Sequence, residues 1–408
     1  MAQGGEPLTA ASSTEGSRGR LSRLVAGLVT LFLLATVLAP ASVLNKLVFG
    51  LLLVFGVLHI GMRPTQSVVP TLSPLIVAVV YLYGMFVSVG GGSDMALARQ
   101  LLLSTMMLFL IYPVVWYRVD LDHSMKVAGV AVACGTAVYT FGSLASVLLP
   151  GAGAIVELMD RYSMAAGGFR TFLGSPVPVY RLGAAPLLLI PFLLFVMDIR
   201  EGAAVRGIAG ALVVGAAIMA SSTRALVLLA AVGAMIVMIE GASRSGRVGW
   251  STLAWLGVCA AVAVLPSTEV FSPSEFSNAI KLGHLRSFAD NLDLHGALFG
   301  DGLANIYFSS GVGRSVAQTE ITWMDQVRYF GFPATVLIAV ALVFPLRRPE
   351  WYRVDRSRQI ALAVFGMYVL LSFTNPVLFN SYGLSVVVWY WWRMLRSDAL
   401  SGRVLGGT

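Results

Sequence analysis

Long runs of apolar residues alternate along this chain with short polar connections. Each run approaches the roughly 20 residues that a helix needs to cross the hydrocarbon core of a bilayer. The pattern therefore predicts an all-α polytopic membrane protein with about twelve transmembrane helices. The predicted spans are 24–40, 46–62, 70–89, 97–116, 127–149, 182–198, 205–221, 224–240, 249–265, 333–346, 359–379 and 382–395.

Two long polar stretches interrupt this pattern. The first, residues 150–181, is rich in glycine and proline, which predicts a partly re-entrant or irregular loop. The second, residues 266–332, is the longest polar stretch of the chain, and a short helix is expected in it near Glu320–Tyr329. Polar chemistry gathered on an otherwise apolar scaffold indicates a functional site, so the second loop is the first place to look for one.

The distribution of basic residues sets the orientation in the membrane. Only 12% of the residues are charged, against about 25% in a soluble domain. With the N-terminus inside, eighteen of the 28 Lys and Arg residues fall on the cytoplasmic side and ten on the other. The positive-inside rule therefore favours a cytoplasmic location for both termini and an outer location for both long loops. The net charge of +8 does not indicate nucleic-acid binding, because no basic soluble domain carries it.

The expected division of the chain follows from these spans and from the orientation. It comprises a disordered cytoplasmic tail (1–23), nine transmembrane helices with the first outer loop (24–265), the large outer loop (266–332), three further transmembrane helices (333–395) and a cytoplasmic tail (396–408).

Arginines on the outer side oppose the insertion bias, so a binding function is the expected reason for them. Arg170, Arg181 and Arg286 lie in the two outer loops, and Arg224 opens a span. A guanidinium group matches phosphate with two parallel hydrogen bonds and stays charged at any working pH. These arginines are therefore candidate ligands of a pyrophosphate group. The alternative is that each contacts lipid headgroups or pairs with a loop acid such as Asp160.

The second loop also holds candidate acid–base groups. If the segment is helical, Asp325 and Arg328 are three residues apart and can pair, which leaves Glu320 for chemistry. A carboxylate in a partly desolvated cavity can act as a general base. The alternative is a carboxylate that only holds the loop together through Arg314 or Arg328.

Other polar residues of this loop have simpler interpretations. His284, two residues before Arg286, is a candidate contact for an anionic ligand. His284 and His295 lack companion ligands at metal spacing, so no metal is expected. The run 299–302, Phe-Gly-Asp-Gly, lacks the third glycine of a nucleotide-binding loop, and we expect a tight turn with Asp301 as a cap.

Several short motifs follow one another in this part of the chain. Arg-Ser-Phe stands at 286–288 and Phe-Gly-x-Gly at 299–302, followed by Tyr307-Phe308 and Thr319-Glu320. This order resembles the large periplasmic loop of Wzy-type O-antigen and exopolysaccharide polymerases. Ser221-Ser222-Thr223-Arg224 resembles the Ser-x-x-Arg signature that these enzymes share with O-antigen ligases.

The resemblance, over about residues 165–345, implies a function. It implies a multi-spanning, GT-C-like glycosyltransferase of the bacterial inner membrane that uses no metal or other cofactor. Its substrates would be a growing glycan and a repeat unit, both carried on undecaprenyl pyrophosphate. Membrane lipids and a chain-length regulator would be its partners.

Residue roles are carried over from the resemblance onto matching positions. Glu320, Arg286 and Asp325 are the expected catalytic residues, with Glu320 as the base where the ligases carry a histidine. The expected substrate contacts are Arg170, Arg181, Arg224, His284, Tyr307 and Arg328.

Two other functions remain open. An O-antigen ligase shares the scaffold but transfers glycan to a lipid A core, and a histidine in place of Glu320 would favour it. A lipid-linked oligosaccharide flippase would need charged residues along a cavity through the membrane. The predicted spans hold acids such as Asp198 only near their ends, which argues against an ion-coupled transporter.

Overall fold

The computed structural model describes residues 10–40, 42–62, 70–90, 92–146, 149, 151, 153–161, 164–172, 175–242, 276–345 and 356–401. These residues are mostly helical. The long helices are α1 (Ala10–Leu38), α2 (Val43–Met62), α3 (Ser73–Ser88), α4 (Met95–Thr105), α6 (Leu121–Ala145), α8 (Leu189–Arg200), α9 (Ala204–Ala220), α10 (Arg224–Ala242), α12 (Phe276–Asn291), α14 (Thr322–Val343), α15 (Arg356–Ser372) and α16 (Ser381–Ser401).

Helices occupy the predicted spans throughout the described part of the chain. The predicted span 249–265 lies outside the described residues. Within them, five segments are long and apolar enough to cross a membrane: Gly19–Leu38, Val43–Gly61, Met95–Trp116, Leu121–Ala145 and Thr322–Val343. The fourth predicted span is composite, because a 3-10 segment, Met106–Leu110, joins α4 to α5 (Ile111–Trp116). The mostly helical character is thereby confirmed, the five candidate spans agree with a membrane protein, and the number of twelve spans stays a prediction.

Two helices begin earlier than predicted. α1 starts at Ala10, inside the stretch expected to be disordered. α14 starts at Thr322 rather than at 333, because the short helix predicted near Glu320–Tyr329 is present and joins the predicted span. The two parts meet at Gly331, whose φ of 76° favours glycine. A Cβ at this position would lie 2.5 Å from the backbone of Leu298, so the close approach also requires glycine.

The first polar loop is regular rather than irregular. After the short helix α7 (Gly153–Arg161), an antiparallel hairpin forms from β1 (Ala165–Phe172) and β2 (Ser175–Leu182). Two prolines of β2 are tolerated because a two-stranded ribbon leaves the outer edge of each strand unpaired. The base of the hairpin packs on α6, where Tyr139 approaches Gly167 closely.

The second polar loop folds into two helices and a small hairpin. α12 is followed by α13 (Leu294–Phe299) and by the antiparallel pair β3 (Tyr307–Ser309) and β4 (Arg314–Val316). The tight turn predicted at 299–302 is present, with positive φ at Gly300 and Gly302. Asp301 was expected to cap the segment after it, but among the described residues no helix follows it before α14. α13, the helix before the turn, is capped by Asp293, whose carboxylate accepts the N–H of Gly296 at 2.7 Å.

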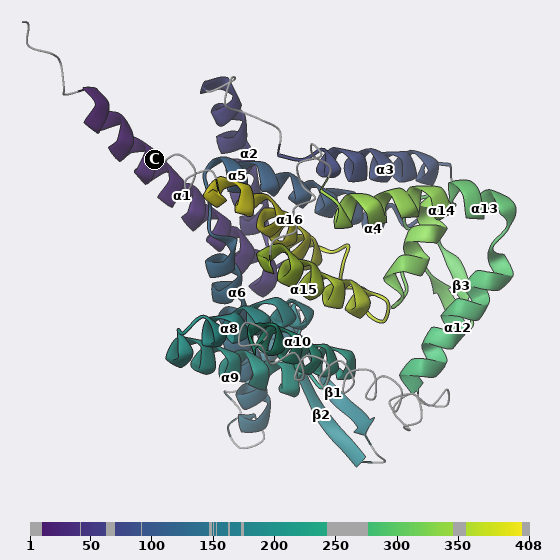
Figure 1. Ribbon diagram of the computed structural model, residues 1–408. Coiled ribbons are helices and arrows are strands. Elements are labelled where there is room, and N and C mark those ends of the chain that lie inside the picture. The colour runs from purple at the N-terminus through teal and green to yellow at the C-terminus, as the bar shows by residue number, and fades with distance from the viewer. Residues whose placement is uncertain are drawn as a thin grey trace, which may run out of the picture.

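Both polar loops lie on the same side of the molecule. In Figure 1 the β1–β2 hairpin and the α12–β4 segment are toward the right, whereas the C-terminal end of α16 and the start of α1 are toward the left. We call the side with the hairpin and α12 the loop face, and the other side the opposite face. This agrees with the order of the predicted spans, which places both long loops on the same side of the membrane.

Candidate functional site

The end of α15 and its connection to α16 contact the large loop at the loop face. The hydroxyl of Thr322 donates to the carbonyl oxygen of Asn375 at 3.0 Å, and the indole N–H of Trp323 donates to Ser372 Oγ at 2.9 Å. On the other side, Arg181 of the hairpin lies close enough to Tyr382 to act electrostatically on its hydroxyl. The hairpin and the large loop therefore border one region of the loop face.

A short segment between β4 and α14, residues 317–321, carries Glu320, and we call it the strap. α14 holds the strap through three hydrogen bonds. Asp325 Oδ2 accepts the N–H of Thr319 at 2.7 Å, while Arg328 Nη2 and the hydroxyl of Tyr329 both donate to the carbonyl oxygen of Ala317 at 2.5 Å. The backbone on either side of Glu320 is therefore fixed to the first turns of α14.

The predicted pair between Asp325 and Arg328 is confirmed, and it is buried. Arg328 Nη2 lies 3.1 Å from Asp325 Oδ1, and both side chains are less than 5% exposed. The guanidinium carbon also lies 4.2 Å from the ring centroid of Tyr307, a cation–π contact. Asp325, expected to be catalytic, and Arg328 and Tyr307, expected to contact substrate, thus lie inside the loop. This placement favours a positioning role for them.

Glu320 itself is open to solvent. Its side chain is 48% exposed, and Lys281 Nζ of α12 lies 3.7 Å from its Oε2. An exposed pair at this distance contributes little to stability. Glu320 therefore combines a fixed backbone with an accessible carboxylate, as a general base requires. Lys281 was not predicted as a site residue, because nothing in the sequence joins it to Glu320.

His284 ties α12 to β3. Its imidazole is buried, and Nδ1 lies 2.6 Å from the hydroxyl oxygen of Ser309. Burial is the main cause that lowers the pKa of His284 below its usual 6.5, and Arg328 lowers it further, whereas the carboxylate of Glu320 opposes the shift. The imidazole is therefore neutral at pH 7, and its burial favours a structural role over contact with an anionic ligand.

A dependence of stability on pH follows from this shift. Below about pH 6.5 the unfolded chain protonates His284 and the folded chain does not, so stability should fall as pH falls. His284→Gln should remove this component and flatten the profile. The measurement is thermal unfolding of the purified protein between about pH 7.5 and about pH 5. His123→Gln, at an exposed histidine of the opposite face, is the control, and an unchanged slope in His284→Gln would contradict the assignment.

Arg286 does not share a face of α12 with His284 or Lys281. Successive helical residues are rotated by about 100°, so Arg286 is displaced by roughly 160° from His284 and roughly 140° from Lys281. Arg286 is accordingly exposed, whereas His284 is buried. The structure thus does not bring Arg286 to the side of the helix that faces Glu320, although Arg286 is only two residues after His284.

Arg170 and Arg181 lie at different positions along the hairpin. Arg181 pairs in register with Ala166 at the base of the hairpin, and Arg170 pairs with Val177 nearer the tip. Their backbones are separated by roughly 13 Å along the ladder, four residues at about 3.3 Å each. Arg181 is half-buried beside Tyr382, while the side chain of Arg170 lies outside what the structure describes.

Arg224 is the first residue of α10. The turn before it is tight: Ser222 has a φ of 46°, and Ser221 Oγ donates to the carbonyl oxygen of Ile218 at 2.7 Å. α9, which leads into this turn, packs against β2. Arg224 is half-buried and follows the end of α9, the helix that packs against the strand carrying Arg181.

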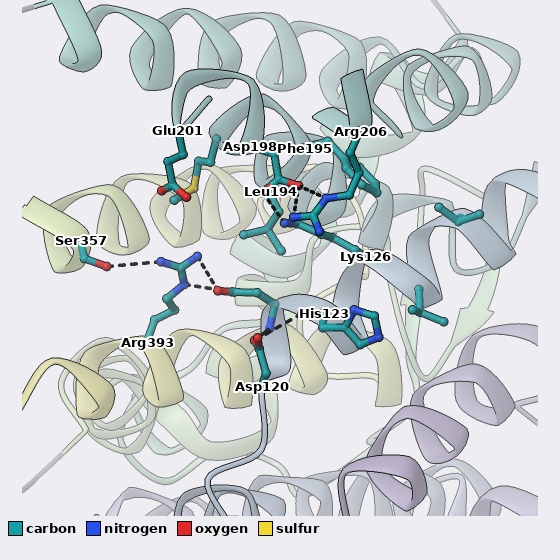
Figure 2. Close-up of a pocket in the computed structure, with 14 residues that line it drawn as sticks. Asp120, His123, Lys126, Leu194, Phe195, Asp198, Glu201, Arg206, Ser357 and Arg393 are labelled. Atoms are coloured by element: carbon teal, nitrogen blue, oxygen red, sulfur yellow. Dashed lines mark hydrogen bonds and ion pairs between the residues drawn. The ribbon is translucent and has the colours of Figure 1, made fainter. Parts of the chain in front are cut away.

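A separate charged cavity of about 840 Å³ opens on the opposite face. It lies between the start of α6, the end of α8, the start of α9 and α16 (Figure 2). α6 runs for 25 residues, or roughly 37 Å, from this cavity toward the loop face. The cavity is therefore distinct from the region around Glu320.

The basic residues of this cavity are paired with its carboxylates. Asp198 accepts from Lys126 Nζ at 2.6 Å and from Arg206 Nη2 at 3.0 Å. Asp122 accepts from Arg393 at 2.7 Å and from the indole N–H of Trp389 at 2.8 Å. Both clusters join helices that are distant in the sequence, as Figure 2 shows for Lys126 of α6 and Asp198 of α8. They stabilise the packing of α6 against α8, α9 and α16.

No group of three or more His, Cys, Asp or Glu side chains suited to a metal ion occurs among the described residues. Comparison with known proteins gives no assignment: the chain matches no protein-family model, no curated protein and no solved structure.

Proposed function

We propose that this protein is a glycosyltransferase that polymerises oligosaccharide repeat units carried on undecaprenyl pyrophosphate. The reaction would take place at the loop face, on the periplasmic side of a bacterial inner membrane. The observation that carries the proposal is the strap: a half-exposed carboxylate, Glu320, whose neighbouring backbone is fixed by buried groups and which faces α12 of the large loop. The motif resemblance supplies the substrate class.

The chemistry assigned to the site is a single displacement. The acceptor hydroxyl oxygen attacks the anomeric carbon of the donor glycan, and the bond from that carbon to the pyrophosphate oxygen breaks. Glu320 accepts the proton of the hydroxyl, and undecaprenyl pyrophosphate leaves with the electron pair. General-base assistance of this kind contributes about 10²–10⁴-fold to a rate.

The leaving pyrophosphate needs compensation for its negative charge. Arg181 and Arg224 are assigned to this charge, since Arg181 lies at the base of the hairpin and Arg224 follows α9, which packs against the same strand. Fixed cationic groups at the developing charge stabilise the transition state without reorganisation. Arg170, nearer the hairpin tip, and Arg286, on the outer surface of α12, are assigned to peripheral contacts with the glycan or the carrier.

The charged cavity of the opposite face is the observation that favours a second candidate, a transporter of lipid-linked oligosaccharide. Lys126, Arg206 and Arg393 line it, as a site for an anionic headgroup requires. Each of them, however, is already paired with a carboxylate. We therefore rank transport below glycosyl transfer.

An assay with purified protein separates these functions. The protein would be reconstituted in vesicles with undecaprenyl-pyrophosphate-linked repeat units, with and without a chelator. A polymerase yields a ladder of longer lipid-linked glycans in both conditions. A ligase yields product only when a lipid A core acceptor is added, and a transporter moves the substrate across the bilayer without forming a covalent product. Absence of any ladder from active preparations would overturn the proposal.

A further inference from the structure

Part of the large loop is apolar and uncovered. On α13, Leu294 is 76% exposed, Phe299 53% and Leu298 45%. Leu294 and Leu298 are four residues apart and share one face of the helix. An exposed apolar cluster of this kind usually marks an interaction surface.

α3 has a similar surface. Its exposed residues Leu75, Val79, Leu82 and Phe86, with Val89 at the C-cap, recur every three or four positions and form one stripe, up to 79% exposed at Phe86. The rest of the helix packs against α4 and α14. In a membrane-spanning chain, an apolar helix with one unpacked apolar stripe presents that stripe to lipid.

Four hydrogen bonds fasten the α13 segment to the end of α3. Tyr83 Oη donates to the carbonyl oxygen of Phe299 at 3.1 Å, and Leu303 N–H donates to the carbonyl oxygen of Gly84 at 3.0 Å. Ser88 Oγ donates to the carbonyl oxygen of Leu303 at 2.8 Å, and a further backbone bond runs between residues 306 and 92. The C-terminal end of α13 therefore lies beside the last turns of α3, and Figure 1 shows α13 next to the end of α3.

The length of α3 explains why a second apolar element is needed there. Its 16 residues extend about 24 Å, less than the roughly 30 Å of a hydrocarbon core. The bilayer must therefore reach beyond the end of α3 on at least one side. Tyr83, 40% exposed, lies near the level of α13, and tyrosine is enriched at the membrane–water boundary.

We propose that α13 is seated in the bilayer leaflet at the loop face, with Leu294, Leu298 and Phe299 in contact with phospholipid acyl chains. The apolar face of α13 extends the lipid-facing stripe of α3. The large loop is then fastened to the bilayer surface instead of projecting into water. This inference needs only the membrane-spanning character of the chain and is independent of the reaction proposed above.

The test is site-directed spin labelling of the full-length protein in vesicles of phosphatidylethanolamine and phosphatidylglycerol. Cys134, which is exposed, and Cys259 would first be replaced by alanine. Single cysteines would then be introduced as Leu294→Cys and Leu298→Cys. Phe86→Cys on the α3 stripe is the lipid control, and Ser315→Cys on exposed β4 is the water control.

The readout is the accessibility of each label to oxygen, which partitions into lipid, relative to a water-soluble nickel chelate. We expect the ratio at positions 294 and 298 to match that at 86 and to exceed that at 315. A ratio at both α13 positions equal to that at 315 would overturn the proposal. Spin–spin broadening at 298 that disappears on dilution with unlabelled protein would also overturn it, because a second copy of the chain would then cover this face.

Discussion

Replacing Glu320 by glutamine is expected to reduce the proposed glycosyl transfer by about 10²–10⁴-fold, the usual contribution of a positioned general base. The amide keeps the shape of the side chain but cannot accept the proton of the acceptor hydroxyl. The fold should be unaffected, because the side chain is 48% exposed and its only ion pair recorded among the described residues is with Lys281. Binding of the lipid-linked donor should likewise remain.

The measurement is the initial rate of polymer formation by purified variants. Glu320→Asp should retain part of the rate, since the carboxylate is kept, whereas Asp290→Asn, at an exposed carboxylate on α12, should leave the rate unchanged. In cells lacking the native gene, the same order should appear as the amount of long-chain glycan on a gel. A wild-type rate in Glu320→Gln would remove Glu320 from the reaction.

The second large effect is on stability. Asp325→Ala should destabilise the large loop by about 3–5 kcal/mol, because it leaves the guanidinium of Arg328 buried without its partner. It also removes the acceptor of the Thr319 N–H. The exposed pair offers a matched control: Lys281→Ala should change stability by no more than about 1 kcal/mol.

A double variant separates the effect of the unpaired Arg328 guanidinium from that of the lost hydrogen bond to the Thr319 N–H. Asp325→Ala combined with Arg328→Met removes both charges, so it should be more stable than Asp325→Ala alone. Hydrogen exchange and limited proteolysis of residues 276–345 are suitable measurements, because they report the loop and not the spans. Equal protection in the wild type and in Asp325→Ala would show that the buried pair does not hold the strap.

The parts of this fold that could be predicted from the sequence are the apolar helices. A bilayer demands about 20 apolar residues per crossing, so the helices could be located before their packing was known. The Asp325–Arg328 pair was equally predictable, since residues three apart on a helix are neighbours whatever surrounds them.

The parts that could not be predicted depend on tertiary contacts. Glycines and prolines made residues 150–181 resemble an irregular loop, yet the ribbon forms where its base packs on α6. Lys281 and Glu320 are far apart in the sequence and meet only because α14 fixes the strap. The polarity of residues 266–332 likewise concealed the apolar face of α13. Two leucines and one phenylalanine change the mean hydropathy of such a long polar stretch very little.

The buried stacking of Arg328 on Tyr307 has a consequence for genetic screens of this protein. An alanine scan scored by surface polysaccharide would rank Arg328 among the essential arginines, although its guanidinium is engaged inside the loop. Loss of polymer in such a strain would reflect a misfolded, degraded chain. Immunoblots of membrane fractions would distinguish the two classes of arginine: depletion of the protein for Arg328→Ala, and normal abundance for Arg181→Ala.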